Sequence, residues 1–193
     1  PSESESLSID GLNLSKVGRK DIARRLSYVP QEHEDMFPFS VLDVVVMGRT
    51  VFLGSFGAPG KKDVQLAHKV LCELQISDLA HRVYTSLSGG EKQLVLLARA
   101  LVQTRKIVFL DEVGAGVNRT LLYKIGDAIK KLNQERGYTF CLIEHDMDFI
   151  ARLCDPVICM AEGTVLAEGT VDEVKNNEQV IEAYLGTGLK HKR

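Results

Sequence analysis

Three short clusters of polar residues have the types and spacing needed to handle a phosphate group. The first cluster is Ser88-Gly89-Gly90-Glu91, which directly precedes an apolar-periodic stretch. Ser88 is a good N-cap, and the first backbone N–H groups of a helix have no partner inside it. Glycines let a ligand approach the backbone closely, and the helix dipole favours negative charge there. From these residues alone, a plain capped helix and an anion site both stay open.

The second cluster is the acidic pair Asp111-Glu112, which follows the wholly apolar run 107–110. In open α/β sheets, ligands bind at the carboxyl ends of buried strands. An aspartate in that place can hold Mg²⁺, and the neighbouring glutamate can take a proton from water. Acidic pairs are also common at strand ends without any such role, so this alternative stays open too.

The third cluster is Glu144-His145, at the end of a second apolar run, 138–143. A lone histidine is more often a satisfied loop or core residue than a functional one. However, this run closely resembles the one that precedes Asp111. Because the carboxyl ends of parallel strands meet at one edge of a sheet, we expect His145 to lie near the acidic pair.

The elements that must position these clusters alternate between strands and helices. Apolar stripes at helical spacing cover most of residues 38–102, with a glycine-rich loop at 54–63. The remaining predicted elements are a hairpin at 7–14, a strand at 25–29, strands at 107–110 and 138–143 with a helix between them that ends at Gly137, a hairpin at 156–169 turning at Glu162-Gly163, and a terminal helix opened by a capping box at 170–173. Buried strands alternating with helices predict an α/β fold with a parallel sheet.

Composition places the chain among ordinary globular proteins. It has 193 residues, of which 45% are hydrophobic and 26% charged, and its net charge of -2 gives no reason to expect nucleic acid as a partner. No apolar run approaches the roughly 18 residues of a membrane span. The four cysteines lack C-x-x-C spacing, and the apolar context of Cys141 and Cys159 predicts buried thiols in a reducing compartment.

Taken in order, the clusters closely resemble the motifs of ATP-binding-cassette (ABC) ATPases. The stretch LSGGEKQ, from residue 87, is similar to the signature motif, IVFLDE, from residue 107, to the Walker B motif, and YVPQ, from residue 28, to the Q-loop. The resemblance covers essentially the whole chain. It implies a P-loop-NTPase-like core with a parallel sheet and flanking helices. Residues 1–37 and 103–193 would form the core lobe, and residues 38–102 an inserted helical subdomain.

The resemblance also implies roles for single residues. Asp111 would organise Mg²⁺, and Glu112 would polarise the attacking water as a catalytic residue. His145 would contact the γ-phosphate of ATP. Gln31 would contact nucleotide and metal, and would link them to the transporter interface.

In this family two subunits pair head to tail and share each nucleotide. By resemblance, Ser88, Gly89 and Gly90, with Glu91 among the nucleotide-binding residues, would grip the γ-phosphate of an ATP held by the opposite subunit. The implied partners are a second ABC ATPase subunit, in a homodimer or heterodimer, and the transmembrane subunits of an importer. The implied place is cytoplasmic, peripheral at the inner face of the cell membrane.

One expected motif is missing from these residues. The family's Walker A loop, G-x-x-x-x-G-K-S/T, has a single near match at 55–62. In this match Ser55 replaces the first glycine, Lys62 replaces the Ser or Thr that should bind Mg²⁺, and no buried strand precedes it. We therefore expect the chain as written to lack ordinary ATP binding in its own site. We also expect open sheet edges and uncovered apolar surface. A fragment, a natural truncation and part of a larger assembly all fit.

Three functions remain open at this point. The first half of the chain resembles importers of iron chelates or cobalamin, and the second half resembles branched-chain amino-acid importers, so the cargo is undecided. The leading interpretation is the ATP-binding subunit of an ABC importer. The alternative is a truncated or chimeric, non-catalytic module that donates only its signature motif or a dimerisation surface. A soluble ABC ATPase outside transport is disfavoured by the importer-like helical subdomain.

Overall fold

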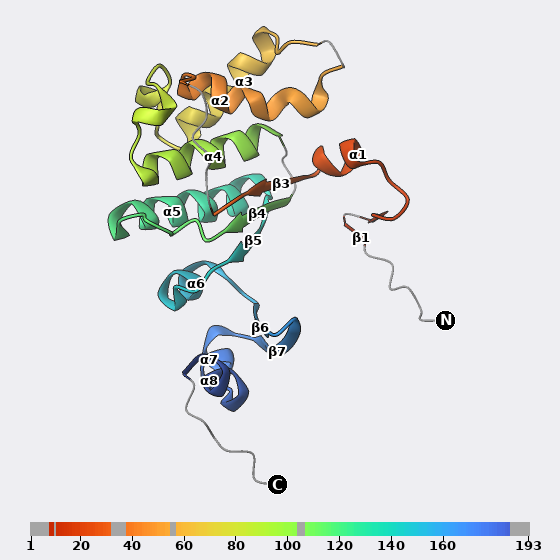
Figure 1. The fold of residues 1–193 in the computed structure, drawn as a ribbon, viewed down its shortest axis with the longest axis vertical. Helices are drawn as coiled ribbons and strands as arrows, with labels where there is room; N and C mark the ends of the chain where they lie inside the picture. Colours follow the sequence, from red (N-terminus) through yellow and green to blue (C-terminus); the bar gives the residue numbers. More distant parts are fainter. Residues whose placement is uncertain (1–7, 10, 32–37, 55–56, 104–106, 186–193) are drawn as a thin grey trace. The chain divides into compact units, whose positions relative to one another are not determined.

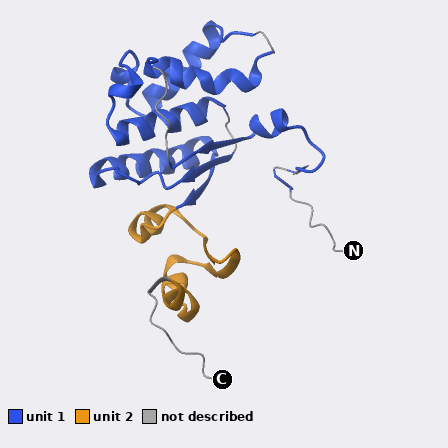
Figure 2. Ribbon diagram, in the orientation of Figure 1, with its two compact units in different colours: residues 1–143 blue, residues 144–193 orange. Residues whose placement is uncertain are grey.

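The computed structural model describes residues 8–9, 11–31, 38–54, 57–103 and 107–185. The chain divides into two compact units, Pro1–Ile143 and Glu144–Arg193 (Figure 2). Each unit is described by itself. This division differs from the expected one into a core lobe and a helical subdomain, which stays a prediction.

A parallel sheet forms the centre of the first unit (Figure 1). Its strands, in spatial order, are β3 (Leu26–Val29), β4 (Ile107–Asp111) and β5 (Thr139–Ile143). In the register, Val29 lies opposite Leu110, and Asp111 lies opposite Ile143. Val29, Val108 and Leu110 are completely buried. The residues of β5 alternate between exposed and half-buried, so the prediction of a second buried strand is wrong there. The predicted α/β fold with a parallel sheet is confirmed.

Two long helices pack on this sheet. The helix α4 (Gly89–Gln103) packs against β3, and α5 (Arg119–Arg136) packs against β5 and α4. The buried stripe of α5 repeats every three or four residues, at Leu122, Ile125, Ile129 and Leu132. The helix ends where the sequence predicts, at Gly137, whose φ of 66° is the left-handed conformation that favours glycine.

A group of shorter helices covers the other side of α4, which therefore lies between them and the sheet (Figure 1). They are α2 (Val41–Val46), the 3₁₀ segments η1 (Met47–Phe52), η2 (Ser77–Leu79) and η3 (Tyr84–Ser86), and α3 (Lys61–Glu73). One close approach is at Gly48 of η1. A Cβ built there would lie 2.2 Å from the carbonyl oxygen of Arg99 in α4. Only glycine allows this crossing.

An ion pair ties η1 to the start of α3. Nε of Arg49 lies 2.8 Å from Oδ1 of Asp63, and the backbone N–H of Gly60 donates to Oδ2 of Asp63 at 3.0 Å. Arg49 also donates to the carbonyl oxygen of Val102 at 2.8 Å. The hydrogen bond from Arg49, followed by the one from Gly60, lowers the pKa of the Asp63 carboxyl group.

We expect Asp63→Asn to lower the free energy of unfolding at neutral pH by about 1 kcal/mol, because the ion pair is lost. Since the pKa of Asp63 is lower in the folded state, its contribution is present above the unfolded pKa of about 3.9 and is lost as the pH falls below that value. Urea unfolding at a series of pH values should therefore show a shallower acid loss for the variant. Parallel acid profiles for the two proteins would contradict this assignment.

On the other face of the sheet, several of the described residues are exposed. Among the described residues, β3 and β5 each pair with β4 alone. Tyr28 on β3 is 49% exposed and Ile143 on β5 is 51% exposed, so apolar surface is uncovered, as expected. Cys141 lies on this face and is exposed, so the prediction of a buried thiol is wrong for Cys141. It is right for Cys159, which is buried in the second unit.

The remaining elements are small. The hairpin of β1 (Ser8–Ile9) and β2 (Leu12–Asn13) precedes α1 (Arg19–Ala23). The second unit contains α6 (Met147–Leu153), β6 (Val157–Ala161), β7 (Thr164–Gly169), α7 (Val171–Lys175) and α8 (Glu178–Leu185). Its core joins Ile150, Val157, Cys159, Val174 and Val180. The predicted hairpin and the capping box of Thr170 and Glu173 are both present. No helix in the described ranges has the length and apolar character to cross a membrane.

Candidate functional site

The structure brings Gln31, Asp111 and Glu112 together at one edge of the sheet. Gln31 lies two residues beyond the end of β3, Asp111 is the last residue of β4, and Glu112 follows it. Because the strands are parallel and adjacent, their carboxyl ends meet there. Nε2 of Gln31 donates a hydrogen bond to Oε2 of Glu112. Three of the predicted site residues therefore form one cluster.

Glu112 has an unusual backbone. Its φ of 43° lies in the left-handed region, which is unfavourable for a residue with a side chain and costs on the order of 1 kcal/mol. Its backbone N–H donates to the carbonyl oxygen of Ile143 at 2.8 Å, and its carbonyl accepts from the N–H of Ala115 at 2.9 Å. These two bonds hold the strained turn. They direct the chain so that the Glu112 carboxylate meets Gln31.

Tyr28 is a site residue that sequence reasoning missed. Its hydroxyl group donates to Oδ2 of Asp111 at 2.5 Å. This hydrogen bond, then burial, then the charge of Asp111 raise the pKa of the Tyr28 phenol, so the hydroxyl stays a donor. The register puts Tyr28 opposite Phe109, two residues before Asp111 on the same face of the sheet. The sequence pattern does not show that β3 pairs with β4, and without this pairing Tyr28 could not be identified as a neighbour of Asp111.

The donor set at this edge fits Mg²⁺ that arrives with a nucleotide. Asp111, Glu112 and Gln31 offer carboxylate and amide oxygens, the ligands that Mg²⁺ prefers. In the described parts of the chain, no group of three or more His, Cys, Asp or Glu side chains could hold a metal. Mg²⁺ is commonly bound by one or two carboxylates together with water and substrate phosphates. The residues therefore suit a shared metal and not an independent metal centre.

The residues of the signature-like stretch form a capping box at the start of α4. The N–H and hydroxyl groups of Ser88 donate to Oε2 of Glu91, at 2.8 and 2.7 Å. The N–H of Glu91 faces the Ser88 hydroxyl at 3.4 Å. The hydrogen bonds from Ser88, backbone first, lower the pKa of Glu91, with a smaller contribution from Arg82. The capped helix is therefore present, and it does not exclude an anion at the same helix end.

The two glycines of this stretch serve different purposes. A Cβ at Gly90 would lie 2.2 Å from Cδ2 of Leu121 and 3.2 Å from Cγ1 of Val117, so Gly90 is needed where α4 packs against the start of α5. A Cβ at Gly89 would meet nothing closer than 3.6 Å. Gly89 leaves the helix end open to a ligand, whereas Gly90 is fixed by packing.

Two alanine substitutions should separate these purposes. Gly90→Ala is expected to lower the free energy of unfolding by about 1.5 kcal/mol, because Leu121 must shift to make room. Gly89→Ala should change it by less than about 0.5 kcal/mol, since the added methyl group makes only ordinary contacts. Urea unfolding followed by circular dichroism measures both. Equal losses for the two variants would show that the packing of Gly90 has been misjudged.

His145 belongs to the second unit and is exposed. It immediately precedes the N-cap of α6, Asp146, whose Oδ1 accepts from the N–H groups of Asp148 and Phe149 at 3.0 and 3.1 Å. The cap fixes the backbone next to His145. The expected meeting of His145 with Asp111 stays a prediction.

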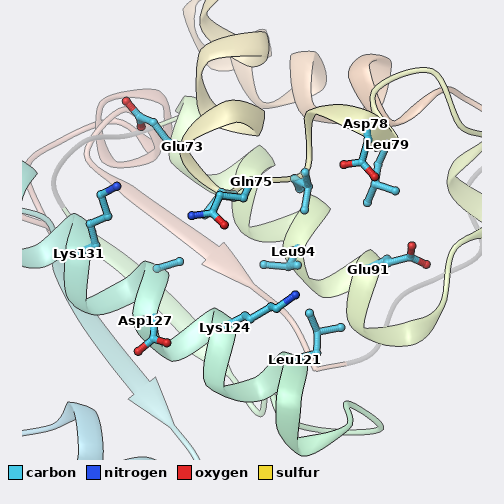
Figure 3. A pocket seen from close by; sticks show the side chains of 13 residues that line it. Glu73, Gln75, Asp78, Leu79, Glu91, Leu94, Leu121, Lys124, Asp127 and Lys131 are labelled. Carbon is cyan, nitrogen blue, oxygen red and sulfur yellow. The ribbon is translucent and has the colours of Figure 1, made fainter.

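A cavity that the sequence did not predict lies beside the start of α4, within the first unit. Its volume is about 350 Å³, and its walls come from the end of α3, η2, α4 and α5. Figure 3 shows Glu91 and Leu94 of α4 facing Leu121 and Lys124 of α5. The lining includes residues of both charges, and Glu91 belongs both to this wall and to the capping box.

Comparison with known proteins gives two matching family models. One, described as "ABC transporter", matches residues 1–115. The other, "Branched-chain amino acid ATP-binding cassette transporter", matches residues 161–190. The second match agrees with the resemblance of the second half of the chain to branched-chain amino-acid importers.

The relatives include ATP-binding proteins of several transport systems. An uncharacterised ABC transporter ATP-binding protein of Haemophilus influenzae is 36% identical over 90% of this chain and 66% of its own length. The manganese transport system ATP-binding protein of Listeria monocytogenes is 37% identical over 83% and 67%. The iron(3+)-hydroxamate import ATP-binding protein of Bacillus subtilis is 31% identical over 86% and 62%. The chain thus spans about two thirds of the length of these relatives.

Solved structures agree with the fold. An ATP-binding cassette of an ABC transporter in its ADP conformation superposes with a TM-score of 0.75 at 26% identity, covering 86% of this chain and 71% of the other. A nucleotide-free cassette gives a TM-score of 0.71 at 25% identity, covering 86% and 69%. Both are cassettes of the predicted α/β class.

Proposed function

The chain belongs to the ATP-binding subunits of ABC transporters, and from that premise we propose that it serves an importer, coupling ATP binding and hydrolysis at a head-to-tail dimer interface to solute transport. The observation that carries the proposal is the cluster of Gln31, Asp111 and Glu112 at the carboxyl edge of the sheet. The name of the iron(3+)-hydroxamate relative supports import, and that of the manganese relative supports transport.

In this proposal the cluster prepares the attack of water on ATP. Asp111 and Gln31 would hold Mg²⁺ together with the nucleotide phosphates, where the ion would supply positive charge to offset that of the phosphates. Glu112 takes a proton from the attacking water. The amide of Gln31 orients the Glu112 carboxylate through their hydrogen bond. Because of this hydrogen bond, a movement of Gln31 would also shift the Glu112 carboxylate.

The start of α4 would serve the ATP of the second subunit. Ser88, Gly89, Gly90 and Glu91 form a helix end, and in the structure the N–H groups of Gly89 and Gly90 have no acceptor among the described residues. Such a helix end attracts phosphate through unpaired N–H groups and the helix dipole. His145, in contrast, would contact the γ-phosphate of the ATP at the site of Asp111 and Glu112. The second subunit can be another copy of this chain or a related one.

Ordinary nucleotide binding needs one further part. None of the 193 residues forms a G-x-x-x-x-G-K-S/T loop, so the lysine and the amide groups of such a loop must come from outside these residues. With that loop in place, ATP and Mg²⁺ are the proposed cofactors. The transmembrane importer subunits would meet residues 38–102, at the cytoplasmic face of the cell membrane.

The absence of that loop within the chain favours a second candidate. In it, the protein is a non-catalytic module that offers Ser88, Gly89 and Gly90 to the ATP of a partner, or only a dimerisation surface. The two candidates differ in one measurable property. The first candidate hydrolyses ATP and needs Glu112 to do so, whereas the second does not hydrolyse ATP.

The test uses the native protein, purified from its own cells through an affinity tag. We expect Mg²⁺-dependent ATP hydrolysis, and association of subunits when ATP is added and hydrolysis is blocked. Membrane subunits identified by mass spectrometry in the same preparation would support the importer assignment. ATP-dependent association without hydrolysis would favour the non-catalytic module, and the absence of ATP-dependent association would refute the proposed function.

A further inference from the structure

We propose that Arg82 is a positioning residue for Ser88 and acts through the carboxylate of Glu91. The proposal rests on the proposed function, in which Ser88 meets the phosphate of a second subunit's ATP. It concerns a residue outside the signature-like stretch. Arg82 lies six residues before Ser88, in the segment between η2 and η3.

The two oxygens of the Glu91 carboxylate have different partners. NH1 of Arg82 lies 3.1 Å from Oε1, while the N–H and hydroxyl groups of Ser88 donate to Oε2. NH2 of Arg82 points to the carbonyl oxygen of Ser86 at 3.4 Å, which ties the arginine to the turn before Ser88. Arg82 therefore fixes the carboxylate from one side, and the carboxylate fixes Ser88 from the other.

The charge of Glu91 explains why a cation is needed at this place. An unneutralised carboxylate beside a phosphate site repels the ligand, since like charges a few ångströms apart disfavour each other. A serine hydroxyl has a single proton, and here it is donated to Glu91. Without Arg82, Glu91 would be more mobile and its negative charge would be unpaired, so it would both loosen the Ser88 loop and oppose the phosphate.

A nearby lysine provides a matched control. Lys124 of α5 lines the same cavity as Glu91, as Figure 3 shows. Asp78 is a further charged residue of this wall. Within the described ranges Lys124 makes no ion pair with Glu91, whereas Arg82 does. Replacing either cation removes one positive charge near Glu91, but only Arg82→Gln removes a contact with it.

The first measurement uses the 193-residue chain alone. The amide hydrogen of Ser88, which is bonded to Glu91, should exchange with solvent about fivefold faster in Arg82→Gln, as expected for the loss of a partly exposed ion pair. It should be unchanged in Lys124→Gln. The amide of Leu97, in the middle of α4, should be unchanged in both, which excludes general destabilisation. Equal Ser88 exchange in the two variants would overturn the proposal.

The second measurement uses the native protein and ATP-dependent subunit association. Arg82→Gln should weaken association about fivefold when Glu91 is present. In the Glu91→Gln background the same arginine substitution should change it by less than about twofold, because no charge remains for Arg82 to hold. An undiminished effect in that background would overturn the proposal. Absence of association in the unsubstituted protein would refute the proposed function, and with it the phosphate role of Ser88, whatever the exchange of Ser88 shows.

Discussion

Glu112→Gln is expected to lower kcat for MgATP hydrolysis by the native protein about a thousandfold, with little change in ATP affinity. The substitution keeps the shape of the side chain and its ability to accept a hydrogen bond from Gln31. It removes the carboxylate that, in the proposed function, takes the proton from water. A residue that loses only this ability should affect the chemical step and spare nucleotide binding.

Glu162 is a matched control for this substitution. Like Glu112, it is a glutamate with a left-handed backbone, with a φ of 49°, but it lies in the turn between β6 and β7. Glu162→Gln should leave kcat unchanged. Single-turnover kinetics with radiolabelled ATP measures the chemical step directly. A Glu112→Gln protein that hydrolyses ATP at the normal rate would rule out Glu112 as the general base.

The fold was predictable where the sequence pattern is local. Two unalternated apolar runs, each followed by acidic or polar residues, predicted β4 and β5 and the place of Asp111 and Glu112. Gly137 predicted the end of α5, and the capping box at Thr170 predicted the start of α7. In each case the signal lies within a few residues of the feature, so no knowledge of tertiary contacts is needed.

The features that were not predictable depend on contacts between distant segments. The bond from Tyr28 to Asp111 requires the register of β3 and β4, which joins residues 83 positions apart. Gly90 was assigned to ligand binding from its place in the motif. The structure also makes it a packing residue under Leu121. Cys141 was expected inside because the run around it is apolar, but it is exposed.

Gly48 is a further residue whose importance depends on a contact between distant segments, and it lies outside the motifs. Gly48→Ala is expected to lower the free energy of unfolding by about 3 kcal/mol. The new methyl group would lie 2.2 Å from the carbonyl oxygen of Arg99 and 2.7 Å from Cγ2 of Val102. Because the first of these is a backbone atom inside α4, no side-chain rotation can relieve the clash. The whole of η1 would have to move away from the helix.

Gly54→Ala is the control, because a Cβ at Gly54 would have nothing within 4 Å. Its free energy of unfolding should stay within about 0.5 kcal/mol of that of the unsubstituted chain. Urea unfolding of both variants, followed by circular dichroism, gives the comparison. A loss below about 1 kcal/mol for Gly48→Ala would mean that η1 can separate from α4 at little cost. Since α4, against which η1 packs, also carries Glu91 and starts directly after Ser88, such freedom would make the η1 crossing a hinge and not a fixed contact.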